Sequence, residues 1–191
     1  MYIMKNVSAH KVYLVIAFVL IFCATCFSGC INENTAVQTD QKVYEWMDTE
    51  MTNVVTKETF TLHELTQDGT PVVVHLIATW CPACNMQFRE STTFLETNPG
   101  KAHIVLIGID ASENSTKIAD YVSSKGYSGI FTTAEAPVIQ GLMDLFGQEI
   151  VMSIPQTVII SGNSLAYLGP GAITSANIAS RIDTISQQVG K

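Results

Sequence analysis

The chain has 191 residues, a formal net charge of −7 and 14% charged residues, which allows one ordinary domain or two small ones. The acidic balance argues against a nucleic-acid binder, because no excess of basic residues is present to neutralise phosphates. Residues 1–29 contain two lysines and no acidic residue, so the other 162 residues carry a net charge of −9. Three of the five cysteines lie in or beside this apolar start. The remainder has a single cysteine pair, which excludes a small fold held together by several disulfides.

The N-terminal segment is typical of an export signal. Two lysines precede an apolar run at 12–27, which is shorter than the roughly 20 residues of a membrane-spanning helix. The sequence F-S-G-C at 27–30 resembles a lipobox, although phenylalanine stands where leucine is usual. We therefore expect a lipoprotein-type signal peptide over 1–29, a lipidated Cys30 and a polar tether over 30–43. The domain would face the extracytoplasmic side of the cell membrane; an uncleaved N-terminal helix as anchor and free secretion are the alternatives.

The rest of the chain alternates between strand and helix patterns. The predicted elements are, in order, a strand or hairpin at 44–60, a helical turn at 62–65, a strand at 72–78, a helix at 81–96, a strand at 104–109, a helix at 114–125, a strand at 130–132, a helix at 137–147, strands at 157–160 and 165–168, and a helix at 174–189. Continuous apolar runs such as 72–78 are typical of strands covered on both faces. We expect one α/β domain over 44–191, with a mixed sheet between two layers of helices.

Two cysteines stand three residues apart where the strand at 72–78 gives way to a helix. Cys81 would lie at the free N–H groups and the positive end of the helix dipole, which stabilise a thiolate and lower the pKa of a thiol. Pro82 suits a first helical turn, because its missing N–H would be unpaired there anyway. The spacing places Cys84 on the same helix face and within disulfide reach. Cys81 could then attack a substrate disulfide, and Cys84 could resolve the mixed disulfide.

Metal binding and a purely structural disulfide are the other interpretations of this pair. A structural zinc site needs four ligands, and no second cysteine pair or histidine pair occurs at ligand spacing. A structural disulfide would not need the N-terminus of a helix. We expect no metal and no bound cofactor, because the electrons would travel as thiols.

The segment 72–84 resembles the active-site region of the thioredoxin superfamily. Its residues 78–84, A-T-W-C-P-A-C, match the A-T-W-C-x-x-C form of the extracytoplasmic reductases similar to TlpA and ResA. The later S-I-P-Q-T at 153–157 is similar to the family's cis-proline segment, and the resemblance covers 44–191. It implies a thioredoxin-like fold and a thiol–disulfide oxidoreductase that reduces disulfides in exported proteins. Such a reductase requires a transmembrane thiol electron donor.

The resemblance also implies roles for residues around the cysteines. A cis peptide bond at Pro155 would present the backbone of Ile154 to an extended substrate, which could pair with it as a short added strand. Trp80 would form a partly exposed platform beside the disulfide. His75 occupies the position of the buried acid of thioredoxins. It is expected either to relay a proton to Cys84 or to be held in the core by hydrogen bonds.

Two departures from the family pattern leave the reduction potential and the direction of the reaction open. The cysteines enclose Pro-Ala, whereas many relatives place proline just before the second cysteine. Gln87 stands where ResA-like proteins often have an acid. A thiol-dependent peroxidase, a copper-binding chaperone of the thioredoxin fold and a binding protein with an idle disulfide remain as alternatives.

Other charged, histidine and methionine residues are expected to be ordinary surface or core residues. The predicted solvated loop charges are Glu64, Asp68, Asp110 and Glu113. The methionines predicted to fill the core are Met143 and Met152, and the predicted surface histidines are His63 and His103.

Overall fold

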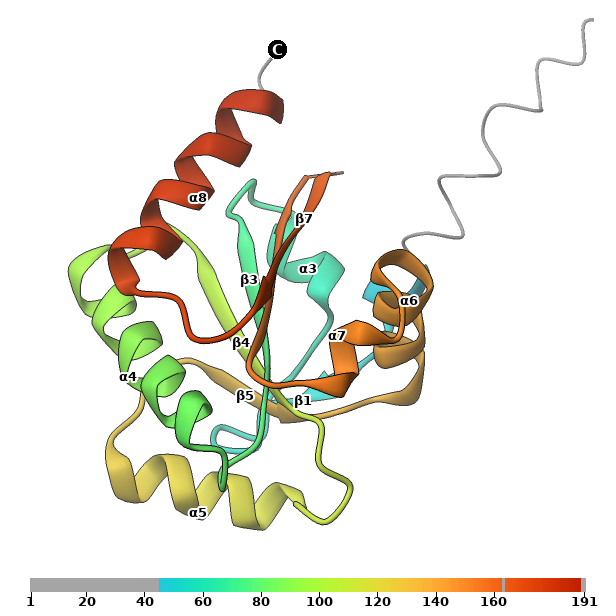
Figure 1. Ribbon diagram of the computed structural model, residues 1–191, viewed down its shortest axis with the longest axis vertical. Helices are drawn as coiled ribbons and strands as arrows, with labels where there is room; N and C mark the ends of the chain where they lie inside the picture. Colours follow the sequence, from blue (N-terminus) through green and yellow to red (C-terminus); the bar gives the residue numbers. More distant parts are fainter. Residues whose placement is uncertain (1–44, 163, 190–191) are drawn as a thin grey trace, which may run out of the picture. The chain divides into compact units, whose positions relative to one another are not determined.

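The computed structural model describes residues 45–162 and 164–189, so the predicted signal peptide, Cys30 and the tether lie outside the described residues. A five-stranded sheet forms the centre of the domain, with the strand order β5-β4-β3-β6-β7 (Figure 1). The strands are β3 (Val72–Ile77), β4 (His103–Gly108), β5 (Ile130–Thr133), β6 (Gln156–Ser161) and β7 (Ser164–Pro170). β3, β4 and β5 are parallel, whereas β6 pairs antiparallel with both β3 and β7. The predicted mixed sheet is therefore confirmed.

Helices cover both faces of this sheet (Figure 1). One layer contains α4 (Pro82–Thr97), α5 (Ser115–Lys125) and α8 (Ser175–Val189). The other contains the 3-10 helix η1 (Glu45–Asp48), α3 (Leu62–Thr66), α6 (Ala136–Phe146) and α7 (Glu149–Met152). Successive side chains of β3 point to opposite faces of the sheet, as strand geometry requires. Val73 packs in the core on the side of Phe88 of α4, and Val74 packs in the core on the side of Leu142 of α6. The three-layer α/β architecture expected from the sequence is confirmed.

The N-terminal segment of the domain contains less strand than the alternation of its residues predicts. Two-residue strands, β1 (Met51–Thr52) and β2 (Thr59–Phe60), form a small antiparallel hairpin after η1. The N–H of Val54 donates to the carbonyl of Phe131 at 2.7 Å, which joins this hairpin to the edge strand β5. The short helix α7 was not predicted; it forms the last turn before the chain enters β6.

The topology brings three segments that are distant in sequence to one end of the sheet. Ile77 and Gly108, the last residues of the neighbouring parallel strands β3 and β4, lie side by side, and Ile109 N–H donates to Ile77 O at 3.0 Å. The antiparallel β6 begins at this same end, with Gln156 opposite Leu76. The segments that follow β3 and β4 and the segment that precedes β6 are therefore neighbours.

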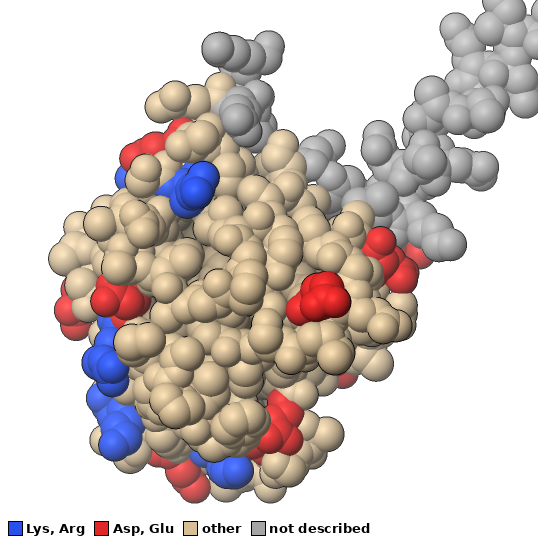
Figure 2. All heavy atoms as spheres, in the orientation of Figure 1, with Lys and Arg blue, Asp and Glu red and all other residues tan. Residues whose placement is uncertain are grey.

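The outer surface of the domain carries both signs of charge. On the face shown in Figure 2, acidic and basic side chains lie mainly along the outline, and much of the middle carries neither. Within the described part of the chain, no helix combines the length and the apolar character that crossing a membrane requires.

Candidate active site

The two cysteines of the domain are free thiols at the start of α4. Cys81 is the N-cap residue, with an extended backbone (φ −79°, ψ 121°), and its sulfur accepts a hydrogen bond from the N–H of Cys84 at 3.3 Å. Pro82 occupies the first turn, where the absent N–H leaves nothing unpaired. The N–H donor and the helix dipole both favour negative charge on the Cys81 sulfur, which is the arrangement predicted for a nucleophile.

The two thiols differ in their access to solvent. Cys81 keeps 6% of its surface exposed, whereas Cys84 is fully buried beneath it. Burial raises the pKa of Cys84 to about 12, and the Cys81 side chain and the negative charge of Glu113 act in the same direction. A substrate disulfide would therefore reach Cys81 first, and Cys84 would react afterwards from inside the domain.

The segment that precedes β6 lies against the first cysteine. The Ile154–Pro155 peptide bond is cis, and the Cys81 Sγ lies 3.7 Å from the carbonyl oxygen of Ile154. Pro155 is buried, and Ile154 is half-buried. The backbone of this segment therefore lies next to the Cys81 sulfur.

A hollow of about 230 Å³ opens beside the first cysteine. Its lining residues are Trp80, Ile109, Asp110, Val151, Met152, Ser153 and Ile154. Trp80 is 62% exposed, which confirms its expected exposure, whereas its part in substrate binding stays a prediction. Met152 is 73% exposed, so its prediction as core filler is wrong: it ends α7 at the rim of the hollow. Met143 packs against the core on the α6 side, as predicted.

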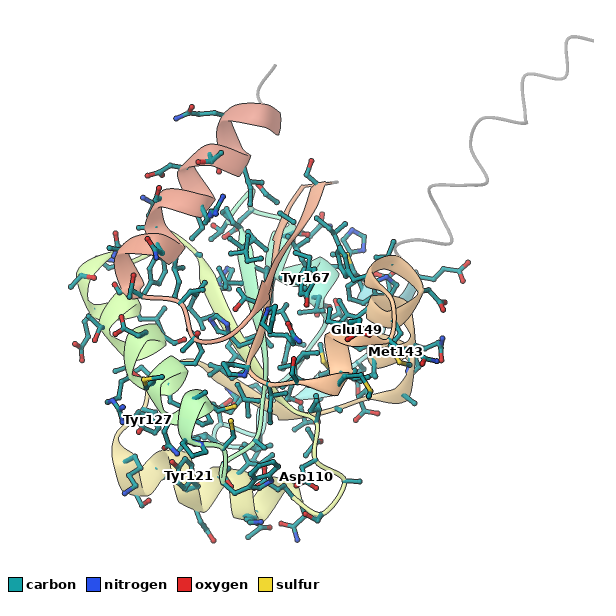
Figure 3. All side chains as sticks on the ribbon, viewed as in Figure 1. Asp110, Tyr121, Tyr127, Met143, Glu149 and Tyr167 are labelled. Carbon is teal, nitrogen blue, oxygen red and sulfur yellow. The ribbon has the colours of Figure 1, made fainter. Side chains whose placement is uncertain are left out.

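The loop that follows β4 orients the tryptophan ring. The indole N–H of Trp80 donates to the Asp110 carboxylate at 2.5 Å. Asp110, labelled in Figure 3, is half-buried. Hydrogen bonds from Ser112 and then from Trp80 lower the pKa of Asp110. This loop therefore holds the exposed indole beside the thiols.

His75 lies in the middle of β3 and is completely buried. Its Nδ1 is 2.9 Å from the Thr157 hydroxyl, and its Nε2 is 3.3 Å from the amide nitrogen of Gln87. Because an amide nitrogen only donates, Nε2 accepts and the Nδ1–H donates to Thr157. The N–H of Ile173 donates to Gln87 Oε1 at 2.9 Å, which fixes the orientation of the amide. Burial lowers the pKa of His75 to about 3, so the ring is neutral at pH 7.

These contacts correspond to the core-histidine alternative. Among the described residues, the hydrogen bonds of His75 go to Thr157 and Gln87, and neither partner is a cysteine. The proton relay stays a prediction. Gln87, which stood out in the sequence only as a departure from related proteins, is fully buried and ties α4 to both β3 and the segment before α8.

The prediction that Glu113 is a solvated loop charge is wrong, because its side chain is completely buried. Its carboxylate accepts hydrogen bonds from the N–H of Thr79, at 2.9 Å, and from the Thr79 hydroxyl, and Lys117 Nζ lies 3.3 Å away. The loop after β4 packs against the segment that leads to Cys81. That packing follows from the pairing of β3 with β4, which local residue patterns do not specify. The available sequence signal was Lys117, one helical turn after the glutamate.

The remaining predicted surface residues lie away from the dithiol. His63 is exposed and lies 2.6 Å from Asp48, and His103 is half-buried, 3.9 Å from Asp68. Within residues 45–162 and 164–189, no group of three or more His, Cys, Asp or Glu is placed to hold a metal ion.

Comparison with known proteins gives a related sequence and many solved structures of similar fold. No protein-family model matches the chain. The thiol:disulfide interchange protein DsbE of Haemophilus influenzae is 25% identical over 118 residues, a match that covers 61% of this chain and 59% of that protein. The chain therefore aligns with less than two thirds of this relative's length.

Three solved structures illustrate the similarity in fold. The pneumococcal exposed lipoprotein thioredoxin Etrx1 from Streptococcus pneumoniae is 15% identical, with a TM-score of 0.58 over 71% of this chain and 98% of that one. A thiol:disulfide interchange protein of the thioredoxin family from Chlorobium tepidum is 19% identical, with a TM-score of 0.58 over 71% and 91%. A secreted Mycobacterium tuberculosis disulfide oxidoreductase is 18% identical, with a TM-score of 0.55 over 73% and 98%. The chain has the thioredoxin-like fold of these proteins, as the sequence predicted.

Proposed function

We propose that this protein is a membrane-tethered, extracytoplasmic thiol–disulfide oxidoreductase that reduces disulfides in exported proteins. The dithiol carries the proposal: Cys81 caps a helix and accepts the N–H of Cys84, which waits buried behind it. The H. influenzae protein is a thiol:disulfide interchange protein, and the M. tuberculosis protein of similar fold is a disulfide oxidoreductase. Their similarity supports the same chemistry here.

The reaction proceeds by two exchanges at the Cys81 sulfur. The Cys81 thiolate attacks a substrate disulfide; a bond between Cys81 and substrate sulfur forms, the substrate S–S bond breaks, and the released sulfur takes a proton from water. The deprotonated Cys84 then attacks Cys81, which forms the Cys81–Cys84 disulfide and releases the second substrate thiol. The substrate gains two electrons and two protons, and the dithiol loses them. No bound cofactor takes part, and a transmembrane thiol donor restores the dithiol.

Trp80, Ile154 and Pro155 are the proposed substrate contacts. An extended substrate segment would lie over the hollow beside the exposed indole, with its backbone against that of Ile154. The Ile154 carbonyl already lies next to the attacking sulfur, so a cysteine held there would be within reach of it.

His75 stays the predicted proton relay for Cys84. Its low pKa opposes protonation of the buried ring at neutral pH, so the relay needs a direct test. If it operates, a His75→Ala variant shows a shifted pH profile for the resolving attack of Cys84. An unchanged profile rejects the relay and leaves a histidine that holds Gln87 and Thr157 in place.

Turnover of insulin with dithiothreitol tests the proposed activity. We expect the wild-type protein to accelerate insulin reduction, Cys81→Ser to show only the background rate, and Cys84→Ser to accumulate a mixed disulfide through Cys81. Ser124→Ala changes an exposed hydroxyl residue of α5 and is the control variant, which should keep the wild-type rate. Full activity of Cys81→Ser contradicts the nucleophile assignment. Tight stoichiometric copper uptake by the reduced protein favours the chaperone alternative instead.

A redox titration of the same dithiol decides the direction of the reaction. A potential near that of thioredoxin, about −270 mV, supports the reductant, and one near about −120 mV supports an oxidant.

A further inference from the structure

A buried carboxylate is attached to the segment that carries the dithiol. Glu113 comes from the loop between β4 and α5, and its side chain has no exposed surface. Both of its hydrogen bonds come from Thr79, two residues before Cys81. Neither step of the proposed exchange uses this group.

The partners of this carboxylate are those that a buried anion requires. A backbone N–H, a hydroxyl and the ammonium group of Lys117 surround it, and the Lys117 side chain is 51% exposed at the edge of α5. A buried charge without such partners would be strongly destabilising. Because Lys117 is half in solvent, its compensation of the negative charge is incomplete.

The segment that Glu113 binds also lies against the buried Cys84. Cys81 N–H donates to Ala78 O at 3.3 Å, and the backbone of Ala78 also lies against the Cys84 thiol. Thr79, which holds the carboxylate, is the next residue. The charge of Glu113 and that of Cys81 both disfavour a thiolate at Cys84.

Other ionisable groups on the surrounding elements have different partners. Those on β3, the β4–α5 loop and α5 are, besides Glu113, His75, Asp110, Lys117, Asp120, Tyr121 and Lys125. Asp120 and Lys125 are exposed. His75 is neutral and hydrogen-bonded to Gln87, and the half-buried Asp110 carboxylate accepts a hydrogen bond from Trp80. Tyr121, labelled in Figure 3, donates to the Asn85 side chain, and burial raises the pKa of its phenol, so it adds no charge near neutral pH.

We propose that Glu113 is a positioning residue for the resolving step: it holds the segment before α4 through Thr79 and places a negative charge beside Cys84, with Lys117 as its counter-charge. The inference rests on the proposed disulfide exchange. The carboxylate disfavours the Cys84 thiolate, so it slows the resolving attack and prolongs the mixed disulfide with the substrate.

Single-turnover oxidation of the reduced full-length protein by 5,5′-dithiobis(2-nitrobenzoate) separates the two steps. The first equivalent of thionitrobenzoate reports attack by Cys81, and the second reports its displacement by Cys84. In Glu113→Gln, loss of the like charge makes the Cys84 thiolate easier to form. The accompanying loss of nucleophilicity offsets only part of this gain, so the second phase is about threefold faster over about pH 6–9. In Lys117→Met, the uncompensated carboxylate makes the same phase about threefold slower. Asp120→Asn, which removes an exposed carboxylate from α5, leaves it unchanged.

Opposite shifts in the two variants support the role of Glu113, because a merely structural contact would move both rates in one direction or neither. Equal rates, or shifts of the same sign, overturn it. Thermal unfolding of each variant is measured alongside, and if Glu113→Gln does not fold, the half-exposed Lys117→Met decides alone. If the wild-type protein reduces insulin and both variants show the wild-type rate of the second phase, the role of Glu113 is rejected and the disulfide exchange stands. Wild-type protein that releases no second equivalent rejects the dithiol chemistry and the inference together.

Discussion

Cys81 and Cys84 illustrate how much the surroundings of identical side chains can differ over one helical turn. The Cys81 sulfur accepts a hydrogen bond from an N–H at the helix terminus, and Cys81 keeps 6% of its surface exposed, whereas Cys84 has no exposed surface. Burial, the neighbouring sulfur and the Glu113 charge all disfavour a thiolate at Cys84. The order of attack in the proposed exchange therefore follows from position in the fold.

His75 makes the stability of the domain sensitive to acid. In the folded protein the pKa of His75 is about 3, whereas its ordinary value is 6.5. Below pH 6.5 the unfolded chain therefore binds a proton at His75 that the folded protein does not. The stabilising contribution is complete above that value and is lost as the pH falls toward 3. By about pH 4.5 the loss from this group is about 3 kcal/mol.

Urea unfolding of wild type and His75→Gln at about pH 7 and about pH 4.5 checks this prediction. The variant lacks the titrating ring, so the difference in unfolding free energy between the two proteins should shrink by about 3 kcal/mol at the lower pH. His63→Gln, which removes an exposed histidine, is the control and should keep the wild-type pH dependence. Parallel curves for wild type and His75→Gln would contradict the burial effect.

At the scale of elements, α6 shows why a glycine lies inside an otherwise apolar helix. In a helix interior, glycine is less favourable than alanine by about 1 kcal/mol. The indole of Trp46, from η1, occupies the space that a Cβ at Gly141 would need. The glycine therefore permits close packing of η1 on α6, within the helical layer on the sheet face opposite α4.

Gly141→Ala should destabilise the domain by about 1–3 kcal/mol, because the methyl group overlaps a buried aromatic ring that cannot move without disturbing the core. Chemical denaturation measures the effect. Gln140→Ala, at the adjacent exposed position of the same helix, should stay within about 0.5 kcal/mol of wild type. A stabilised Gly141→Ala would mean that the intrinsic helix preference of alanine outweighs the contact with Trp46.

For the whole molecule, sheet order assembles the candidate site. The ends of β3 and β4 and the start of β6 meet at one end of the sheet, which places Trp80, Asp110 and Ile154 around a single hollow although the last two follow the first by 30 and 74 residues. The proposed export signal would deliver this site outside the cytoplasm, where a dithiol meets disulfides of exported proteins.

Mass spectrometry of the membrane fraction tests the proposed anchor. A mature chain that starts at a lipid-modified Cys30 is the expected result, and Cys30→Ser should abolish the modification while Cys23→Ser leaves it intact. An intact N-terminus in the membrane fraction would instead support an uncleaved helix as anchor, and unmodified protein in the medium would support secretion.

The sequence by itself determined the order of the five sheet strands and the main helices, and the helix N-terminus at Cys81. These depend on local signals: apolar runs, Pro82 after a strand, and a cysteine spacing of one helical turn. The thioredoxin-like fold was indicated by the resemblance of residues 78–84 and 153–157 to that superfamily. Only the tertiary structure decided that Glu113 is buried against Thr79, that Gln87 and Thr157 bind both nitrogens of His75, and that Met152 lies on the rim. Those contacts join residues on different elements, and a loop charge or methionine has the same local pattern whether the sheet topology covers it or leaves it in solvent.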